Sequence, residues 1–464
     1  MNLINPAFGP VAVPNQSALD NEISTVHPLY IKKIPLWETV RDTMEGEYHI
    51  KQLGQKYLPM TSGQASLPDS EGTKRYDAYK KRARFYDIVA PSVRGLVGLA
   101  HDKPAIVELP PRMEYLLENA DAGRMTLEDF ARNVTRETLQ TGRCPILVDS
   151  PVEGGDPYLV LYPAESLINW KQDEIGYYLA VFEEAEYEDE QSFSHECVTR
   201  YRVLKLVEGK YTVEVYEDSS TDSQSNASGY SLIEEYTLDH DFIPLSVAGS
   251  INTDAEPNEP PMLPIARSAI SMYQLSADYR QSLFMTAQPT PVTTGLGDDK
   301  PSSIGADTVW HLPEGATAAF LEVSGNGITL TKEAIQDEML KAEQHGSNLI
   351  QSGNQAEAAE TLRLRMLAQY ATLQSVVMSG AEAIEKSLRH IAVWMNIDPN
   401  TVSYKANTDF MNVVDLSQLS TLNQAVSAGN LPKTILFEAT RQAGLTELDD
   451  EALDDLLEIE PPIL

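Results

Sequence analysis

The stretch 344–360, QHGSNLIQSGNQAEAAE, separates two strongly patterned segments of the chain. Residues 329–343 (TLTKEAIQDEMLKAE) precede it and residues 358–395 (AAETLRLRMLAQYATLQSVVMSGAEAIEKSLRHIAVWM) follow it, and both repeat apolar residues at helical spacing. The stretch itself is rich in Ser, Asn, Gln and Gly, which compete with helical hydrogen bonds or relax the backbone. We therefore expect a helix over 331–345, a polar connection, and a helix over 356–395 that is roughly 60 Å long.

A second pair of features stands upstream of this stretch. Residues 265–288 (IARSAISMYQLSADYRQSLFMTAQ) have helical patterning, and the Pro-rich EPNEPPMLP before them reads as a linker. Residues 289–325, which contain DTVWHLPEGATAAFLEV, predict a small β segment. The chain therefore leaves along one helix, makes a β excursion and returns along the helix 331–345.

The returning helix has two distinct faces. Its apolar stripe consists of Ile335, Met339 and Ala342 and is suited to packing against neighbouring helices. A polar face is formed at i, i+3 and i, i+4 spacing by Glu333, Asp337, Lys341 and Gln344. The pattern leaves two roles open for this polar face: the lining of a channel or the solvated outside of an assembly.

The N-terminal part predicts an α+β domain. After an extended arm over 1–35, we expect a helix around 35–46 and a helical segment over 75–100 that Pro91 kinks or divides. Thr126 should cap a helix that Gly142 ends. CPILVD (144–149) then reads as a buried strand, and period-two patterning after it predicts one antiparallel sheet, with strands at 157–162, 177–187, 196–207, 210–217 and 242–249.

Charge is the strongest compositional signal. The 464 residues include 69 acidic and 35 basic side chains, which gives a formal net charge of −34. Because phosphate binding depends on Lys and Arg, we expect no basic cluster that grips nucleic acid and only weak, non-specific binding of duplex DNA. We also expect repulsion from anionic membranes, no membrane-spanning helix and no signal peptide.

The residues offer no recognisable catalytic chemistry. The chain contains no P-loop, no G-x-S-x-G elbow and no His pair at metal-ligand spacing, and GLGDDK (295–300) resembles a hairpin turn more than a phosphate loop. The acidic run EEAEYEDE (183–190) is a weak candidate for a cation, and a solvated strand end is the simpler interpretation. Cys144 and Cys197 predict two buried thiols rather than a disulfide, in a reducing cytoplasm. We expect no enzyme, cofactor or metal.

The order of these parts resembles the portal proteins of tailed bacteriophages. The resemblance rests on LWETVRDTMEG, YLP, FARNVTRETLQTGRCPILVDSP, PIARSAISMYQLSADYRQSLF and FMNVVDLSQLSTLNQAVSAGNLPKTILFEATRQAGL, and it covers most of residues 35–445. It implies the following parts: an N-terminal arm and wing (1–262), a first stem helix (263–288), a clip (289–330), a second stem helix (331–349), a tunnel loop (350–357), a long helix returning to the wing (358–409) and a crown (410–464).

The resemblance also implies a function, a location and partners. Portal subunits form a ring of about twelve copies at one capsid vertex, through which double-stranded DNA is packaged and ejected. The implied partners are the major capsid protein, the terminase and a head–tail connector, and the implied location is the virion after assembly in the host cytoplasm. The acidic composition fits a passage that must not hold DNA tightly.

The implied contact residues fall in two segments. The DNA-facing loop would present Asn348, Gln351, Ser352, Asn354 and Gln355, whose neutral amides and hydroxyls release phosphates easily. An ordinary helix connection is the plain alternative. The clip would contact neighbouring subunits through Trp310, Leu312, Phe320 and Leu321, because about 40 residues bury too little surface to be stable alone.

Two rival functions stay open on the sequence. One is another head–tail connector or minor capsid component, although connectors are usually smaller and lack a helix–β–helix hairpin before a long helix. The other is a metal-dependent enzyme that uses acidic ligands. Sizing under native conditions separates them, since only the portal hypothesis predicts a large ring.

Overall fold

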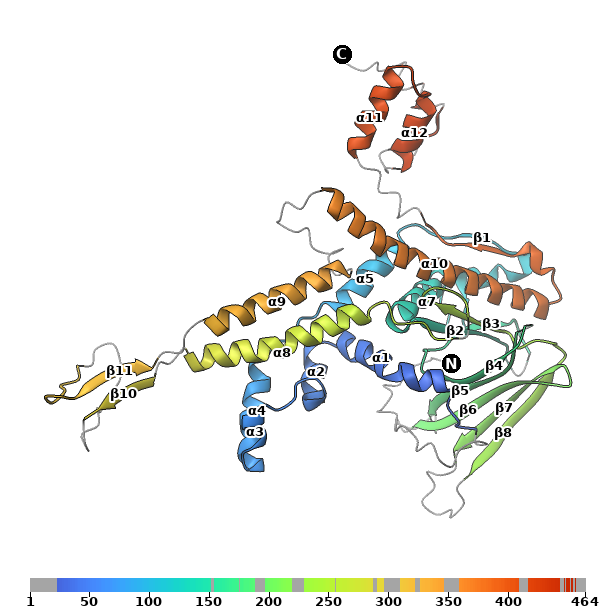
Figure 1. Ribbon diagram of the computed structural model, residues 1–464. Helices are drawn as coiled ribbons and strands as arrows, with labels where there is room; N and C mark the ends of the chain where they lie inside the picture. The colour runs from blue at the N-terminus through green and yellow to red at the C-terminus, as the bar shows by residue number, and fades with distance from the viewer. Residues whose placement is uncertain are drawn as a thin grey trace. The chain divides into compact units, whose positions relative to one another are not determined.

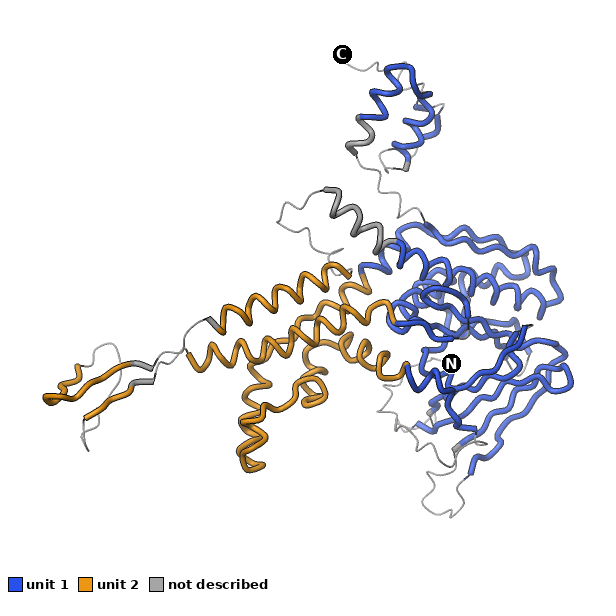
Figure 2. The backbone as a smooth tube through the Cα atoms, viewed as in Figure 1, with its two compact units in different colours: residues 1–32, 95–259, 356–464 blue, residues 33–94, 260–355 orange. Residues whose placement is uncertain are grey.

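In the computed structural model of this protein, the chain is divided into two compact units (Figure 2). Unit 1 comprises residues 1–32, 95–259 and 356–464, and unit 2 comprises residues 33–94 and 260–355. The structure describes residues 23–151, 154–174, 176–187, 197–218, 229–254, 256–286, 290–295, 309–321, 326–345, 359–408, 416–442, 446, 448–450, 452–453 and 455.

Helices are distributed along the whole described chain (Figure 1). They are α1 (Pro28–Met44), α2 (Glu47–Leu53), α3 (Ser62–Ala65), α4 (Asp69–Arg82), α5 (Val89–Ala100), α6 (Tyr115–Glu118), α7 (Leu127–Thr141), α8 (Leu263–Thr286), α9 (Asn326–Gln344), α10 (Ala359–Trp394), α11 (Leu416–Ser427) and α12 (Lys433–Gln442), with 3-10 turns at Gly54–Lys56, Pro111–Met113 and Pro399–Thr401. Together with the strands described next, these helices confirm a mixed α+β fold.

The strands form separate antiparallel sheets. They are β1 (Ile106–Glu108), β2 (Arg143–Asp149), β3 (Tyr158–Leu161), β4 (Leu167–Gln172), β5 (Tyr177–Tyr187), β6 (Cys197–Val207), β7 (Lys210–Asp218), β8 (Tyr230–Leu238), β9 (Leu245–Gly249), β10 (Thr290–Thr294), β11 (Thr317–Leu321) and β12 (Ser403–Lys405). The sheet orders are β3-β2-β9, β4-β5-β6-β7-β8, β1-β12 and β10-β11. The expectation of one sheet is therefore wrong: β3 and β9 pair with β2 in the three-stranded sheet, whereas β4 to β8 form the five-stranded sheet.

The core of unit 1 lies where α7 and α10 cover the three-stranded sheet. Thr126 caps α7 by accepting the Asp129 N–H at 3.1 Å, and Gly142 ends the helix at φ +73°, as predicted. A side chain at Gly142 would meet the Glu259 carbonyl oxygen at 2.8 Å, so the close approach requires glycine. Side chains from α7, α10 and the sheet form one cluster that includes Phe130, Val134, Cys144, Ile146, Ile384, Leu388 and Ile391.

The long helix α10 crosses this core and continues without interruption through Ser379 and Gly380. The Ser379 hydroxyl accepts the Gly249 N–H at 3.1 Å and donates to the Asn252 carbonyl at 3.0 Å. A side chain at Gly380 would lie 3.4 Å from a methyl group of Val134. The Ser–Gly pair thus fastens α10 closely to its neighbours.

A buried arginine joins the three-stranded and the five-stranded sheet. Arg143 on β2 is fully buried, donates to the Leu167 carbonyl at 2.9 Å and lies with its guanidinium 4.3 Å from the ring centre of Trp170. Burial lowers the pKa of Arg143 to about 10. The His27 ring stacks on Trp170 with ring centres 3.9 Å apart, and the backbone N–H of His27 donates to the Ile168 carbonyl.

Several expected boundaries differ from those observed. The first helix begins at Pro28 instead of 35, since Pro28 occupies the first helical position and Pro35 is accommodated inside. The segment 75–100 divides into α4 and α5, and Pro91 lies in the first turn of α5. Helix α9 begins at Asn326, before the start expected at 331.

The cysteines and the C-terminal helices complete the comparison. Cys144 and Cys197 form no disulfide; Cys144 is buried as expected, but Cys197 is exposed. The segment predicted as the crown contains the short helices α11 and α12. Among the described residues, none of the helices has the length and apolar character needed to cross a membrane.

Candidate assembly site on the helical hairpin

Helices α8 and α9 of unit 2 pack side by side as a hairpin (Figure 1). The β10–β11 ribbon lies between them in the chain, at the end of the hairpin. The sequence produces this arrangement because Pro260 and Pro261 end the preceding segment, and the Leu263 N–H then bonds to the Pro260 carbonyl at 3.1 Å. Helix α8 leads outward and α9 returns, so the two helices pack antiparallel. The hairpin agrees with the helix–β–helix order predicted from the sequence.

The first part of α8 is firmly packed. Its buried residues are Leu263, Ile265, Ala266, Ser268, Ala269, Met272, Tyr273, Ser276 and Ala277. Polar contacts to α4 and the residues after it secure the helix: Tyr79 donates to Asp278 at 2.6 Å, and the Ser276 hydroxyl accepts the Arg84 N–H at 2.9 Å. Burial, reinforced by the bond to Asp278, raises the pKa of Tyr79 well above its usual value. This part of α8 therefore has its partners within unit 2.

The outer end of the hairpin lacks such cover. We define the distal apolar surface as Leu283, Phe284, Met285, Val292 and Leu330, all of which are exposed. Met285 is 63% exposed and Leu330 65% exposed, which is high for large apolar side chains. The Arg82 guanidinium lies 3.8 Å from the centre of the Phe284 ring, yet that ring stays 51% exposed.

The four residues predicted on the polar face belong to α9. Glu333, Asp337, Lys341 and Gln344 are all exposed, whereas Ile335 and Met339 are half-buried and Ala342 is buried. Lys341 donates to Glu338 at 2.6 Å, and this contact raises the pKa of Lys341. The helix thus turns its apolar stripe inward and leaves a mixed, mainly acidic face in solvent.

The ribbon beyond the hairpin pairs Thr290 with Leu321 at one end and Thr294 with Thr317 at the other. The hydroxyls of Thr294 and Thr317 lie 2.6 Å apart. Among the predicted clip contacts, Trp310 is half-buried and Leu312 is exposed. Phe320 and Leu321 lie on β11, but their side chains fall outside the described part of the structure.

The predicted tunnel residues lie outside the described residues. This applies to Asn348, Gln351, Ser352, Asn354 and Gln355. Their role stays a prediction from the sequence. Sequence reasoning also missed the distal apolar surface, although a signal was present: Leu283, Phe284 and Met285 are consecutive, so they cannot all face one side of an amphipathic helix.

A metal centre finds no support in the described residues, where no three His, Cys, Asp or Glu side chains gather closely enough to hold an ion. The chemistry available at the hairpin is therefore that of contact: an apolar outer end, an acidic flank and a small ribbon. Such a surface can dock another protein chain.

Comparisons with known proteins add the following. A family described as a domain of unknown function (DUF4055) matches residues 261–395, a stretch that begins just before α8 and ends one residue after α10. No curated protein matches the chain.

Similar solved structures come from gene transfer agent (GTA) particles. One is the virion of the native particle, with 14% sequence identity, a TM-score of 0.43, and coverage of 75% of this chain and 89% of that chain. Another is the neck of the empty particle computed with C6 symmetry, with the same identity and TM-score and coverage of 81% and 91%. The neck of the native particle computed with C12 symmetry gives the same values as the virion.

Proposed function

We propose that this chain is the portal subunit of a tailed-phage-like particle. In this function it is a structural head–tail protein without enzymatic activity, and its copies form a ring at one capsid vertex that gives passage to double-stranded DNA. The α8–α9 hairpin would be the stem and the β10–β11 ribbon the clip. The α+β part of unit 1 would belong to the wing.

The distal apolar surface carries this proposal. Large apolar side chains at Met285 and Leu330 are exposed to solvent on a single chain, although the first part of α8 is packed. Exposed apolar side chains that gather at one end of an element favour contact with another protein. In a ring, the same hairpin of each neighbouring copy would bury this surface, and a small ribbon such as β10–β11 would gain support that it lacks alone.

The charge supports the DNA-conduit part of the proposal. A net charge of −34 repels a polyanion, and the exposed face of α9 adds Glu333 and Asp337 to that field. A passage built this way would let duplex DNA move without strong phosphate contacts. Terminase, head–tail connector and major capsid protein are the partners that such a ring would need.

Native mass spectrometry and negative-stain imaging of the purified full-length chain test the proposal. We expect closed rings of about twelve subunits, and weak DNA binding that vanishes with moderate salt. A chain that stays monomeric or dimeric at every accessible concentration would contradict the portal function. So would sub-micromolar binding of free duplex DNA at physiological salt.

A further inference from the structure

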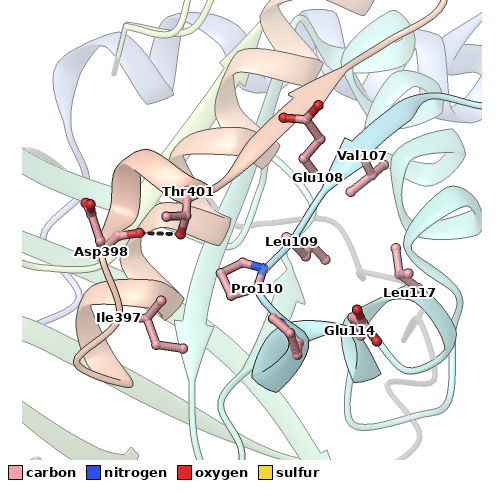
Figure 3. A pocket seen from close by; sticks show the side chains of 10 residues that line it. Val107, Glu108, Leu109, Pro110, Glu114, Leu117, Ile397, Asp398 and Thr401 are labelled. Atoms are coloured by element: carbon pink, nitrogen blue, oxygen red, sulfur yellow. Dashed lines mark hydrogen bonds between the residues drawn. The ribbon is translucent and has the colours of Figure 1, made fainter.

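A groove of about 750 Å³ lies in unit 1 between the β1 strand and the turn after α10 (Figure 3). Its floor is apolar and is formed by Val107, Leu109, Pro110, Leu117 and Ile397. Pro110 and Pro111 end β1 because they cannot donate ladder hydrogen bonds, and the Met113 N–H closes the following turn on the Pro110 carbonyl at 2.7 Å. Leu117 is 43% exposed, so the floor is open to an incoming side chain.

Three carboxylates surround this floor. Glu108, Glu114 and Asp398 line the groove and are exposed. Asp398 accepts the Asn400 N–H at 3.0 Å, but no ion pair from a Lys or Arg to any of the three is found within the described ranges. An apolar floor with acidic edges matches Lys and Arg side chains, whose aliphatic stems pack on apolar surface while their charged ends reach carboxylates.

The chain contains one segment of this chemistry, and the prediction of no basic cluster is wrong there. Residues 74–84 (KRYDAYKKRAR) contain six basic side chains and one acidic one, in a chain with 35 basic residues altogether. Most of these residues belong to α4. The strongly negative net charge of the whole chain hides this local excess of basic residues when only the total composition is considered.

The packing of α4 leaves a basic face outward. Tyr76 and Tyr79 are buried, and the Tyr76 hydroxyl donates to the Leu58 carbonyl at 2.9 Å. Lys74 and Lys81 are exposed, and the described residues provide no ion-pair partner for either. Their i, i+7 spacing puts them on one side of the helix, about 10 Å apart along its axis. This basic face is therefore available to an acidic partner.

We infer that the groove of one subunit receives the basic face of α4 from a second copy of this chain. The inference rests on the proposed function, because a ring joins two different surfaces of identical subunits at each contact. Subunits that each carry a charge of −34 repel one another, so a ring gains from a local pairing of opposite charges at its interfaces. The Lys74 and Lys81 stems would lie on the apolar floor, and their ammonium groups would meet Glu108 and Glu114.

A charge exchange between two full-length variants tests this contact. One variant carries Lys74→Glu with Lys81→Glu, and the other carries Glu108→Lys with Glu114→Lys. Each alone should need at least about tenfold more protein for half-maximal ring formation than the unaltered chain, since like charges then face each other. An equimolar mixture should restore assembly, because alternating subunits present opposite charges at every contact.

Matched controls separate this contact from a general charge effect. Lys74→Arg with Lys81→Arg keeps the charge and should assemble normally. Lys171→Glu with Arg136→Glu changes two exposed basic residues elsewhere and should also leave assembly unchanged. Circular dichroism checks that each variant folds. If Lys74→Glu with Lys81→Glu does not fold, Lys74→Gln with Lys81→Gln takes its place, and we expect a smaller loss of assembly from it.

The outcomes distinguish this inference from the proposed function. If the unaltered chain forms rings and either reversal variant assembles equally well, the inference is wrong and the ring stands. Failure of the mixture to restore assembly also overturns the inference, because the two surfaces then do not meet. If the unaltered chain forms no ring, the proposed function falls and this contact falls with it.

Discussion

The core around α7 and α10 and the outer end of α8 both present large apolar side chains, but the chain covers only the first. Phe130, Ile384 and Leu388 are each at most 2% exposed in unit 1. Met285 and Leu330 in unit 2 remain mostly in solvent. One region is thus completed by folding, whereas the other has apolar surface left for association. Mutations in the two regions should therefore affect different measurements.

The largest effect on folding is expected in the core. Phe130→Ala removes a buried aromatic ring from α7 and should cost about 3–5 kcal/mol of unfolding free energy. Met285→Ala removes a side chain of comparable size from an exposed position and should change it by less than about 0.5 kcal/mol. Chemical denaturation of both variants, under conditions that keep the chain monomeric, measures the difference.

Similar losses from the two substitutions would break the comparison. They would mean that Met285 is buried in the folded monomer, and the distal apolar surface would no longer support assembly. Conversely, a stable Met285→Ala chain whose rings form less readily would sharpen the distinction between folding and association.

An intermediate effect is expected from pH at the edge of the same core. His390 on α10 stacks near Phe242, with ring centres 4.9 Å apart, and its buried Nδ1 has no hydrogen-bond partner among the described residues. Burial lowers the pKa of His390 from 6.5 to about 3. The folded state thus favours neutral imidazole, and stability present above pH 6.5 is lost as the pH falls towards the folded pKa.

The size of this loss follows from proton linkage. Between pH 6.5 and pH 5, the single histidine should remove about 2 kcal/mol of unfolding free energy. The His390→Phe variant should therefore lose about 2 kcal/mol less unfolding free energy than the unaltered chain over this pH range. Other titrating groups contribute equally to both proteins. Denaturation midpoints at the two pH values measure it, and equal pH sensitivity of both proteins would show that His390 is solvated.

The same contrast explains how much the sequence could predict. Local rules worked where neighbouring residues decide the structure: Thr126 and Gly142 bound α7, and period-two patterning identified β5, β6 and β7. Strand β8 was missed, because most residues of Tyr230–Leu238 are exposed and its IEE sequence breaks the alternation. The division into two sheets depends on long-range pairing, such as β2 with β9, which local patterns do not specify.

The candidate site divides in the same way. The polar face of α9 follows from helical spacing, and its four residues are exposed on that helix. The distal apolar surface depends on where α4 stops covering α8, and the basic face of α4 depends on which side Tyr76 and Tyr79 turn inward. Both require knowledge of helix packing, which the spacing of residues does not contain.

The smallest effect on folding should come from the polar face of α9, where the sequence left two roles open. Glu333→Lys with Asp337→Lys changes exposed positions, so the unfolding free energy should shift by no more than about 0.5 kcal/mol. In the proposed ring this face lines the channel, and about twelve copies of the change would create a basic band there. The variant ring should then bind duplex DNA, with affinity that falls steeply as salt rises because each phosphate contact releases counterions.

Glu234→Lys with Glu235→Lys makes the same charge change on exposed positions of β8 and serves as the control. DNA binding by rings of both variants, measured across a salt series, gives the answer. Equal binding by the two variants would place the α9 face on the solvated outside of the assembly, since DNA would then respond to net charge alone.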